Sequence, residues 1–177
     1  MPGVRRIIVG VSGSPGGLQA LRHAADLARI HRAVLIPLLA WTPPGGDVAD
    51  RSHPSPYLRK VWQDAAWQRL WEAVELALGG IPGDVEFESH VVRGAPGQVL
   101  TGVACRPGDL LVFGAGRRGP VAHALSCRVS RYCLAHAVCP VVAVPPPALA
   151  LANHGLRGWA FRHRGLSPAD LELPASH

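Results

Sequence analysis

The sequence predicts an α/β fold in which helices cover both faces of a parallel β-sheet. Short apolar runs alternate with segments of helical periodicity through most of the 177 residues, which is the pattern of strands joined by helical crossovers. The run 33–41 is almost continuously apolar, as in a strand buried on both faces of a parallel sheet. Since such crossovers are right-handed, five strands and four helices are expected to form a three-layer sandwich.

The first strand and helix follow directly from the N-terminal residues. The β-branched run 6–11 predicts a strand that ends at a Ser/Gly-rich turn. Ser14 has the side chain of an N-cap, and Pro15 suits the first helical position. Apolar residues at helical spacing then extend the predicted helix to about His31.

The second strand contains a proline and is followed by an insertion. Pro37 lies inside the predicted strand 33–41, and because proline has no N–H to donate, we expect a bulge or distortion there. Residues 42–56 are polar, rich in proline and glycine, and without periodicity. We expect this insertion to be a disordered crossover, and its length also allows a lid over a site on the sheet.

The middle of the chain predicts a long helix and an edge strand. Helical periodicity extends over 57–78 and stops at a Gly/Pro sequence. The three tryptophans of this helix, Trp62, Trp67 and Trp71, are interpreted as core or interface residues. Alternation with period two over 85–91 predicts an edge strand with one solvated face.

The C-terminal part of the domain is predicted to repeat the pattern of helix and strand. The expected elements are a short helix at 98–105, a strand at 109–113, a helix at 126–137 and a strand at 138–144, closed by three prolines. Residues 148–177 lack a sustained period. We therefore predict one domain over 1–147 and an irregular, partly disordered extension over 148–177.

Composition narrows the possible functions. The chain has 48% hydrophobic and 17% charged residues, a net charge of +6 and a pI near 9.9. The cations are scattered, and all but Lys60 are arginines. The charge therefore permits contacts with phosphate but does not by itself indicate a nucleic-acid partner.

The cysteines and the apolar segments indicate the compartment. The four cysteines, Cys105, Cys127, Cys133 and Cys139, form no CxxC pair and have no zinc-type histidine partners. They are interpreted as core residues, and no metal site is predicted. No apolar stretch resembles the core of a signal peptide or a membrane span. We expect a reduced, cytoplasmic protein without a membrane partner.

The stretch 108–147 carries the strongest functional signal. A strand, the Gly/Arg loop 114–120 and a helix follow one another. This succession presents backbone N–H groups and positive charge to an anion. The alternative is that the glycines only form a tight turn and that the arginines are solvated.

Several motifs, in this order, resemble the universal stress protein family. They lie at 7–14, 94–96, 108–114, 129–130 and 136–141. The resemblance extends from Arg5 to Pro145 and implies a Rossmann-like fold of the adenine nucleotide alpha hydrolase type, with a five-stranded parallel sheet in the order 3-2-1-4-5. It also implies a homodimer formed through the last strand, here from Cys139 to Val144.

One branch of this family binds ATP after the fourth strand, through Gly-x-x-Gly, nine further residues and Gly-Ser or Gly-Thr. This chain has Gly114 and Arg117 at the two glycines, and Cys127-Arg128 in place of the later pair, followed by matching Val129 and Ser130. A shifted register, with Gly116 and Gly119 as the two glycines, places Val129 at the third. Side chains at glycine positions obstruct the close approach of phosphate, whereas arginines supply guanidinium contacts to an anion.

By this resemblance, a nucleotide site has two parts. The residues near the base are Gly10, Ser12 and Trp41, with Ser12 standing where the family often has an acidic residue. The residues near the phosphates are Gly114, Arg117, Arg128, Val129 and Ser130. The implied cofactor is ATP with Mg²⁺, and the departures from the glycine motif predict weak binding or none.

Three classes of function remain open at this point, and nucleic-acid binding is a minor alternative that rests on the net charge alone. The first is a stress-response or signalling homodimer that acts through an unidentified protein partner, and the departures from the motif favour it. The second is a regulatory switch that binds ATP or another nucleotide through an Arg-rich loop. The third is an enzyme, which has the least support because the loop offers His123 without a carboxylate, and His136 suits the end of its helix. No catalytic residue is predicted.

Overall fold

The computed structural model describes residues 3–115 and 120–147, and for residues 47, 49 and 120–127 it describes the backbone alone. Arg117 and the predicted extension 148–177 lie outside the described residues. The elements, in chain order, are β1 (Arg6–Gly10), α1 (Pro15–His31), β2 (Val34–Trp41), α2 (Gly46–Ser52), α3 (Pro56–Leu78), β3 (His90–Arg93), α4 (Pro96–Val103), β4 (Asp109–Gly114), α5 (Pro120–His136) and β5 (Val141–Val144).

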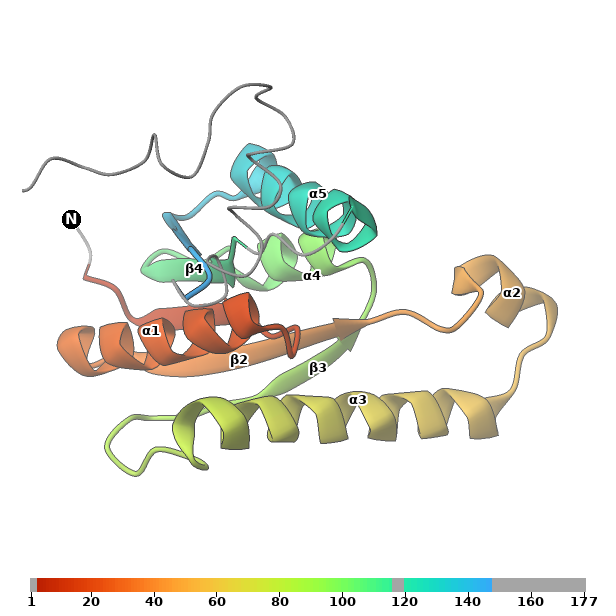
Figure 1. Ribbon diagram of the computed structural model, residues 1–177, viewed down its shortest axis with the longest axis horizontal. Coiled ribbons are helices and arrows are strands. Elements are labelled where there is room, and N and C mark those ends of the chain that lie inside the picture. Colours follow the sequence, from red (N-terminus) through yellow and green to blue (C-terminus); the bar gives the residue numbers. More distant parts are fainter. Residues whose placement is uncertain (1–2, 116–119, 148–177) are drawn as a thin grey trace, which may run out of the picture. The chain divides into compact units, whose positions relative to one another are not determined.

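All five strands run parallel in one sheet, in the order β3-β2-β1-β4-β5. One core joins α1 and α3 to one face of this sheet, and a second core joins α4 and α5 to the other face. Figure 1 shows these layers, with α3 and α5 on opposite sides of the strands. The predicted three-layer α/β sandwich and its strand order are confirmed. The difference is the additional short helix α2.

The predicted helix start after β1 is also confirmed. Ser14 is the N-cap of α1, and its Oγ accepts a hydrogen bond from Gly17 N at 3.1 Å. Pro15 is the first residue of the helix, where a missing N–H costs nothing. The start of α1 is therefore fixed by local sequence, directly after the strand that lies in the middle of the sheet.

Pro37 interrupts a ladder of β2 without causing the expected bulge. β2 keeps one register to β1 along the paired residues. Leu35 N donates to Glu86 O at 2.8 Å, on the β3 side. Because alternate N–H groups of a strand point the same way, the missing N–H of Pro37 also falls on that side. The pairing of β2 with the neighbouring segment is interrupted between a bridge at Phe87 and the start of β3 at His90. The strand predicted over 85–91 therefore begins further along the chain than expected.

The insertion after β2 is folded, which corrects the expectation of a disordered crossover. It contains α2, and the buried carboxylate of Asp50 holds this helix in place. Asp50 accepts hydrogen bonds from Arg59 Nε at 3.0 Å and pairs with Arg93 Nη2 at 2.8 Å. A composition rich in proline and glycine therefore does not prevent order here, because one carboxylate ties α2 to α3 and to the end of β3.

Candidate functional site

A cavity of about 690 Å³ lies at the carboxyl edge of the sheet. It opens where β1 ends, between β2 on one side and β4 on the other. The chain leaves β1 toward β2 and returns to β4 on the opposite side, so this is the topological switch point where open α/β sheets bind ligands. The described lining residues are Gly10–Gly13, Leu38–Ala40, Arg69, Glu72, Ala73, Leu76, Ala95–Gln98, Leu100, Phe113, Gly114, Arg128–Ser130 and Tyr132.

Gly114 brings the end of β4 against the start of α1. A Cβ atom at Gly114 would lie 2.8 Å from Gly17 N and closer still to the carbonyl of Gly16. Both contacts are with backbone, which cannot move away as a side chain can. The close approach of β4 to α1 therefore requires glycine at this position, and it forms the wall of the cavity beside Ser12.

Ser12 presents a hydroxyl at the mouth of the cavity. Its side chain is exposed, and its Oγ lies 3.0 Å from Ser14 Oγ, which is itself held by Gly17 N. Gly13 between them has a positive φ of 60°, in the left-handed region that favours glycine. The turn thus orients Ser12 with a hydrogen bond while leaving it accessible to a ligand.

The N-terminus of α4 opens into the same cavity without a cap. Its N-cap residue, Ala95, makes no side-chain hydrogen bond to the helix. Gly97 and Gln98 follow in the first turn and line the cavity. Gly97 packs on Tyr132 so closely that a Cβ would lie 2.8 Å from the ring. Backbone N–H groups in an uncapped first turn favour an anion.

Charged side chains lie on two different helices of the lining. Arg128 is exposed on α5, next to Val129 and Ser130. Arg69 and Glu72 lie on α3, on the opposite face of the sheet. The remaining lining is mainly apolar. The cavity therefore combines a surface suited to an aromatic or aliphatic group with a polar end formed by Ser12, Arg128, Ser130 and the start of α4.

The structure brings together six of the residues predicted for a site. These are Gly10, Ser12, Gly114, Arg128, Val129 and Ser130. Trp41 does not belong to the lining, because its side chain is buried in the core shared with α1 and α3, and the guanidinium of Arg93 lies 5.9 Å from its ring. Arg117 lies outside the described residues.

Sequence reasoning missed the wall formed by α3 and α4. The turn Gly94-Ala95-Pro96 at the end of an edge strand was a signal for α4, since a helix that begins after a parallel strand points its N-terminus at the carboxyl edge. No local signal marks Arg69, Glu72 or Tyr132. Their places depend on how α3 and α5 pack on the sheet.

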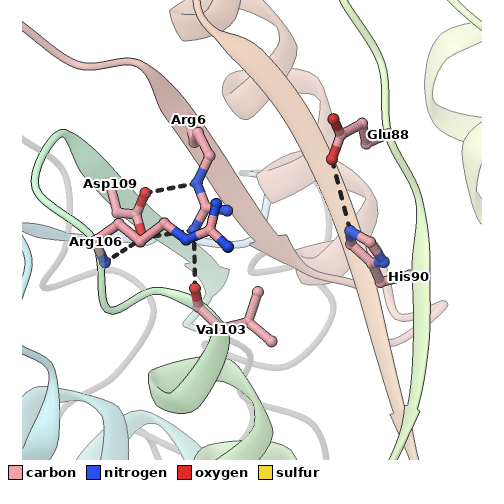
Figure 2. Close-up of polar contacts among 6 residues, drawn as sticks. All are labelled: Arg6, Glu88, His90, Val103, Arg106 and Asp109. Atoms are coloured by element: carbon pink, nitrogen blue, oxygen red, sulfur yellow. Dashed lines mark hydrogen bonds and ion pairs between the residues drawn. The ribbon is translucent and has the colours of Figure 1, made fainter.

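The amino edge of the sheet carries a different polar cluster (Figure 2). Arg6 donates from Nε and Nη2 to the two carboxylate oxygens of Asp109, each at 2.8 Å, and Arg106 N donates to the same carboxylate at 2.8 Å. Burial acts to raise the pKa of Asp109, but the hydrogen bonds from Arg6 and Arg106 outweigh it and hold the pKa below its ordinary value. This cluster joins β1 to β4 and stabilises the fold.

Among the described residues, no group of three or more His, Cys, Asp and Glu side chains could hold a metal ion. No helix in that part of the chain is both long and apolar enough to cross a membrane.

The fold defines a Rossmann-like α/β protein, and it has a cavity at the switch point of its sheet. Residues 3–145 match the profile of the Universal stress protein family, and the chain belongs to this family. Membership places it among stress-response proteins. No curated protein matches the chain significantly.

Three solved structures illustrate the similarity in fold. A universal stress protein crystallised in complex with cAMP is 23% identical, with a TM-score of 0.50, and the match covers 82% of this chain and 99% of that one. The universal stress protein UspA from Lactobacillus plantarum is 18% identical with a TM-score of 0.56, covering 81% and 99%. The hypothetical protein MJ0577 is 15% identical with a TM-score of 0.64, covering 81% and 97%. At these identities the comparison shows the fold alone.

Proposed function

We propose that the chain is a non-enzymatic regulator of the stress response that binds a nucleotide in the cavity at the carboxyl edge of the sheet. The observation that carries the proposal is the convergence of Ser12, Gly114, Arg128 and Ser130 with the uncapped start of α4. Hydroxyl, guanidinium and backbone N–H groups at one place suit a phosphate. The cAMP complex of a protein with the same fold supports this choice of ligand class.

The remaining lining fits the nucleoside. Gly10 at the end of β1 and Leu39 and Ala40 at the end of β2 offer an apolar surface for a base. Trp41 has no part in this proposal, because it is buried beneath Arg93. Arg117, three positions after Gly114 in the sequence and outside the described residues, remains a predicted phosphate ligand.

We further propose that a single phosphate suits this cavity better than the triphosphate of ATP. Of the described lining residues, Arg128 is the one cation on the α5 side, and Arg69 lies beside the acidic Glu72 on α3. The described residues offer no acidic cluster for Mg²⁺. A triphosphate needs more compensating charge than the described lining residues provide. ATP is therefore expected to bind weakly.

The test is calorimetric titration of the purified protein with cAMP, AMP and ATP, the last with and without Mg²⁺. We expect saturable binding of the monophosphates that Arg128→Ala weakens by about tenfold or more, the loss of one charge-assisted phosphate contact. The matched control is Arg131→Ala, an exposed arginine on the same helix that does not line the cavity. Absence of heat and of thermal stabilisation at millimolar concentrations of every nucleotide would refute the proposal and leave a regulator that acts through a protein partner.

We also propose that the chain forms a homodimer through β5. Leu111 N and Ala115 N of the β4 side donate to Pro140 O and Val144 O. Alternation of the strand then directs the N–H and C=O of Ala143 away from β4, at an open edge of the sheet. Ala143→Pro removes an outward N–H without touching the ladder to β4, and it should convert the dimer to a monomer in sedimentation velocity while leaving the fold intact. An unchanged dimer would exclude this edge.

A further inference from the structure

The N-terminal half of α3 extends beyond the part of the helix that packs on the sheet. All the buried residues of this helix lie from its middle onward, namely Ala66, Leu70, Ala73 and Val74. In residues 56–65 no side chain is buried. Figure 1 shows this end of α3 projecting past β2 and β3 toward α2.

The projecting half carries an exposed apolar stripe. Tyr57 is 75% exposed, Leu58 42% and Val61 41%, and Ala65 continues the row at helical spacing. Four neighbouring apolar positions on one exposed helix face are more than the isolated apolar residues that ordinary surfaces carry. Trp62, by contrast, is partly buried and packs against the core.

The projection is held firmly from its inner side. Arg59 lies on that side of α3 and donates to Asp50 of α2, whose side chain is 1% exposed. The same carboxylate pairs with Arg93 at the end of β3. The contacts of Asp50 with Arg59 and Arg93 thus fix α2 beside the projecting turns, while the stripe stays exposed. Arg59 contributes most to holding the pKa of Asp50 below its ordinary value, so the support persists at neutral pH.

Two opposite charges flank the stripe on the same edge. Lys60, the only lysine of the chain, and Asp64 are four residues apart and both exposed. Within the described part of the chain, neither has an ion-pair partner, although their spacing permits one. In an antiparallel pair of identical helices, residues on the same edge face each other across the two-fold axis.

We propose that this half of α3 is a self-association surface and that its occupant is the same segment of a second copy, in antiparallel orientation. Tyr57, Val61 and Ala65 of each copy form the apolar centre. Lys60 of each copy pairs with Asp64 of the other, so that one segment supplies both halves of two reciprocal ion pairs. The surface is separate from β5, which lies at the other end of the sheet.

The small size of this surface determines how strongly two copies are expected to associate. Fewer than three helical turns take part on each side, well below the area of a standard stable interface. Association is therefore weak and depends on protein concentration. If the chain already dimerises through β5, association through α3 would join these dimers into larger assemblies. If it does not, association through α3 would give a reversible dimer.

The test uses the full chain with Ala143→Pro, which removes any contribution of β5, in sedimentation velocity over a range of concentrations up to several hundred micromolar. We expect reversible self-association. Lys60→Asp or Asp64→Lys alone replaces two attractions by two repulsions and should weaken association by about tenfold. The double variant Lys60→Asp/Asp64→Lys restores opposite charges and should recover association. Val61→Glu places a charge in the apolar centre and should abolish it.

Each outcome decides the proposal. A monomer at all concentrations overturns it, since the stripe would then be covered by another segment of the chain or by a different protein. Loss of association in the single variants without recovery in the double variant overturns the reciprocal pairing. Thermal unfolding of all variants serves as the control for folding. Nucleotide titration of the same proteins should be unaffected by Lys60→Asp, which separates this result from that of the proposed nucleotide site.

Discussion

Replacing Asp109 by asparagine removes the charge that joins β1 to β4 at the amino edge of the sheet. The carboxylate accepts two hydrogen bonds from the Arg6 guanidinium and one from Arg106 N, and its side chain is 1% exposed (Figure 2). Asparagine keeps the size of the side chain but turns one acceptor into an NH₂ group facing a cation. We therefore expect a loss of stability and no change of fold.

The magnitude follows from the burial of the two partners. Removing one member of a buried ion pair costs about 3–5 kcal/mol, because the other charge is left without compensation. The Arg6 side chain is 20% exposed and regains part of its hydration, so the expected loss of unfolding free energy is about 3 kcal/mol, near the lower end of that range. Urea unfolding at pH 7 measures it as a shift of the midpoint at constant slope.

The pH dependence of the unfolding free energy is a second test of the interaction between Arg6 and Asp109. The folded-state pKa of Asp109 is lowered, so its contribution is complete above the ordinary carboxyl pKa and is lost as the pH falls through the lowered value. The difference in stability between the original chain and Asp109→Asn should be constant from pH 5 to pH 8 and shrink in stronger acid. The control is Asp84→Asn, which breaks an exposed pair with Arg29 and should cost little. Equal losses in the two variants would refute the reasoning.

Three further changes test the carboxyl edge. Gly114→Ala forces β4 away from the backbone at the start of α1, and it should cost about 1–3 kcal/mol in thermal unfolding and weaken nucleotide binding in titration; full binding would show that this wall does not shape the site. Ser14→Ala removes the N-cap of α1 and should cost about 1 kcal/mol in urea unfolding, with a value near zero contradicting the capping role. Asp50→Asn should release α2 from Arg59 and Arg93, which speeds hydrogen exchange and proteolysis within 46–52 while exchange in β1 stays slow; unchanged protection of α2 would mean that another contact holds it.

Much of the sheet could be predicted because its strands carry their own signal. The run 33–41 is apolar on both faces, and β2 is buried on both faces of the sheet. Ser14 and Pro15 mark the start of α1 without any tertiary contact. Resemblance to a family supplied the strand order, which no local pattern contains.

The departures arise where a distant contact decides local structure. The segment with α2 has the composition of an unstructured linker, and it folds because Asp50 meets arginines from α3 and β3. Trp41 ends the apolar run 33–41 at the carboxyl edge, but the alternation of β2 turns its side chain into the core and not toward the cavity. Pro37 is tolerated because the N–H that it lacks points at a short edge strand.

The two edges of the sheet differ in how their polar groups are paired. At the amino edge, Arg6 and Asp109 form an ion pair, and the buried carboxylate also accepts a hydrogen bond from Arg106 N. At the carboxyl edge, Ser12 is exposed with its Oγ beside Ser14 Oγ, and the first N–H groups of α4 receive no acceptor from the side chain of their N-cap residue, Ala95. A helix start left uncapped lowers stability, and it is tolerated where a ligand completes it. The nucleotide proposed for this edge should accordingly raise the thermal stability of the chain, and it should do so less when Arg128 is replaced.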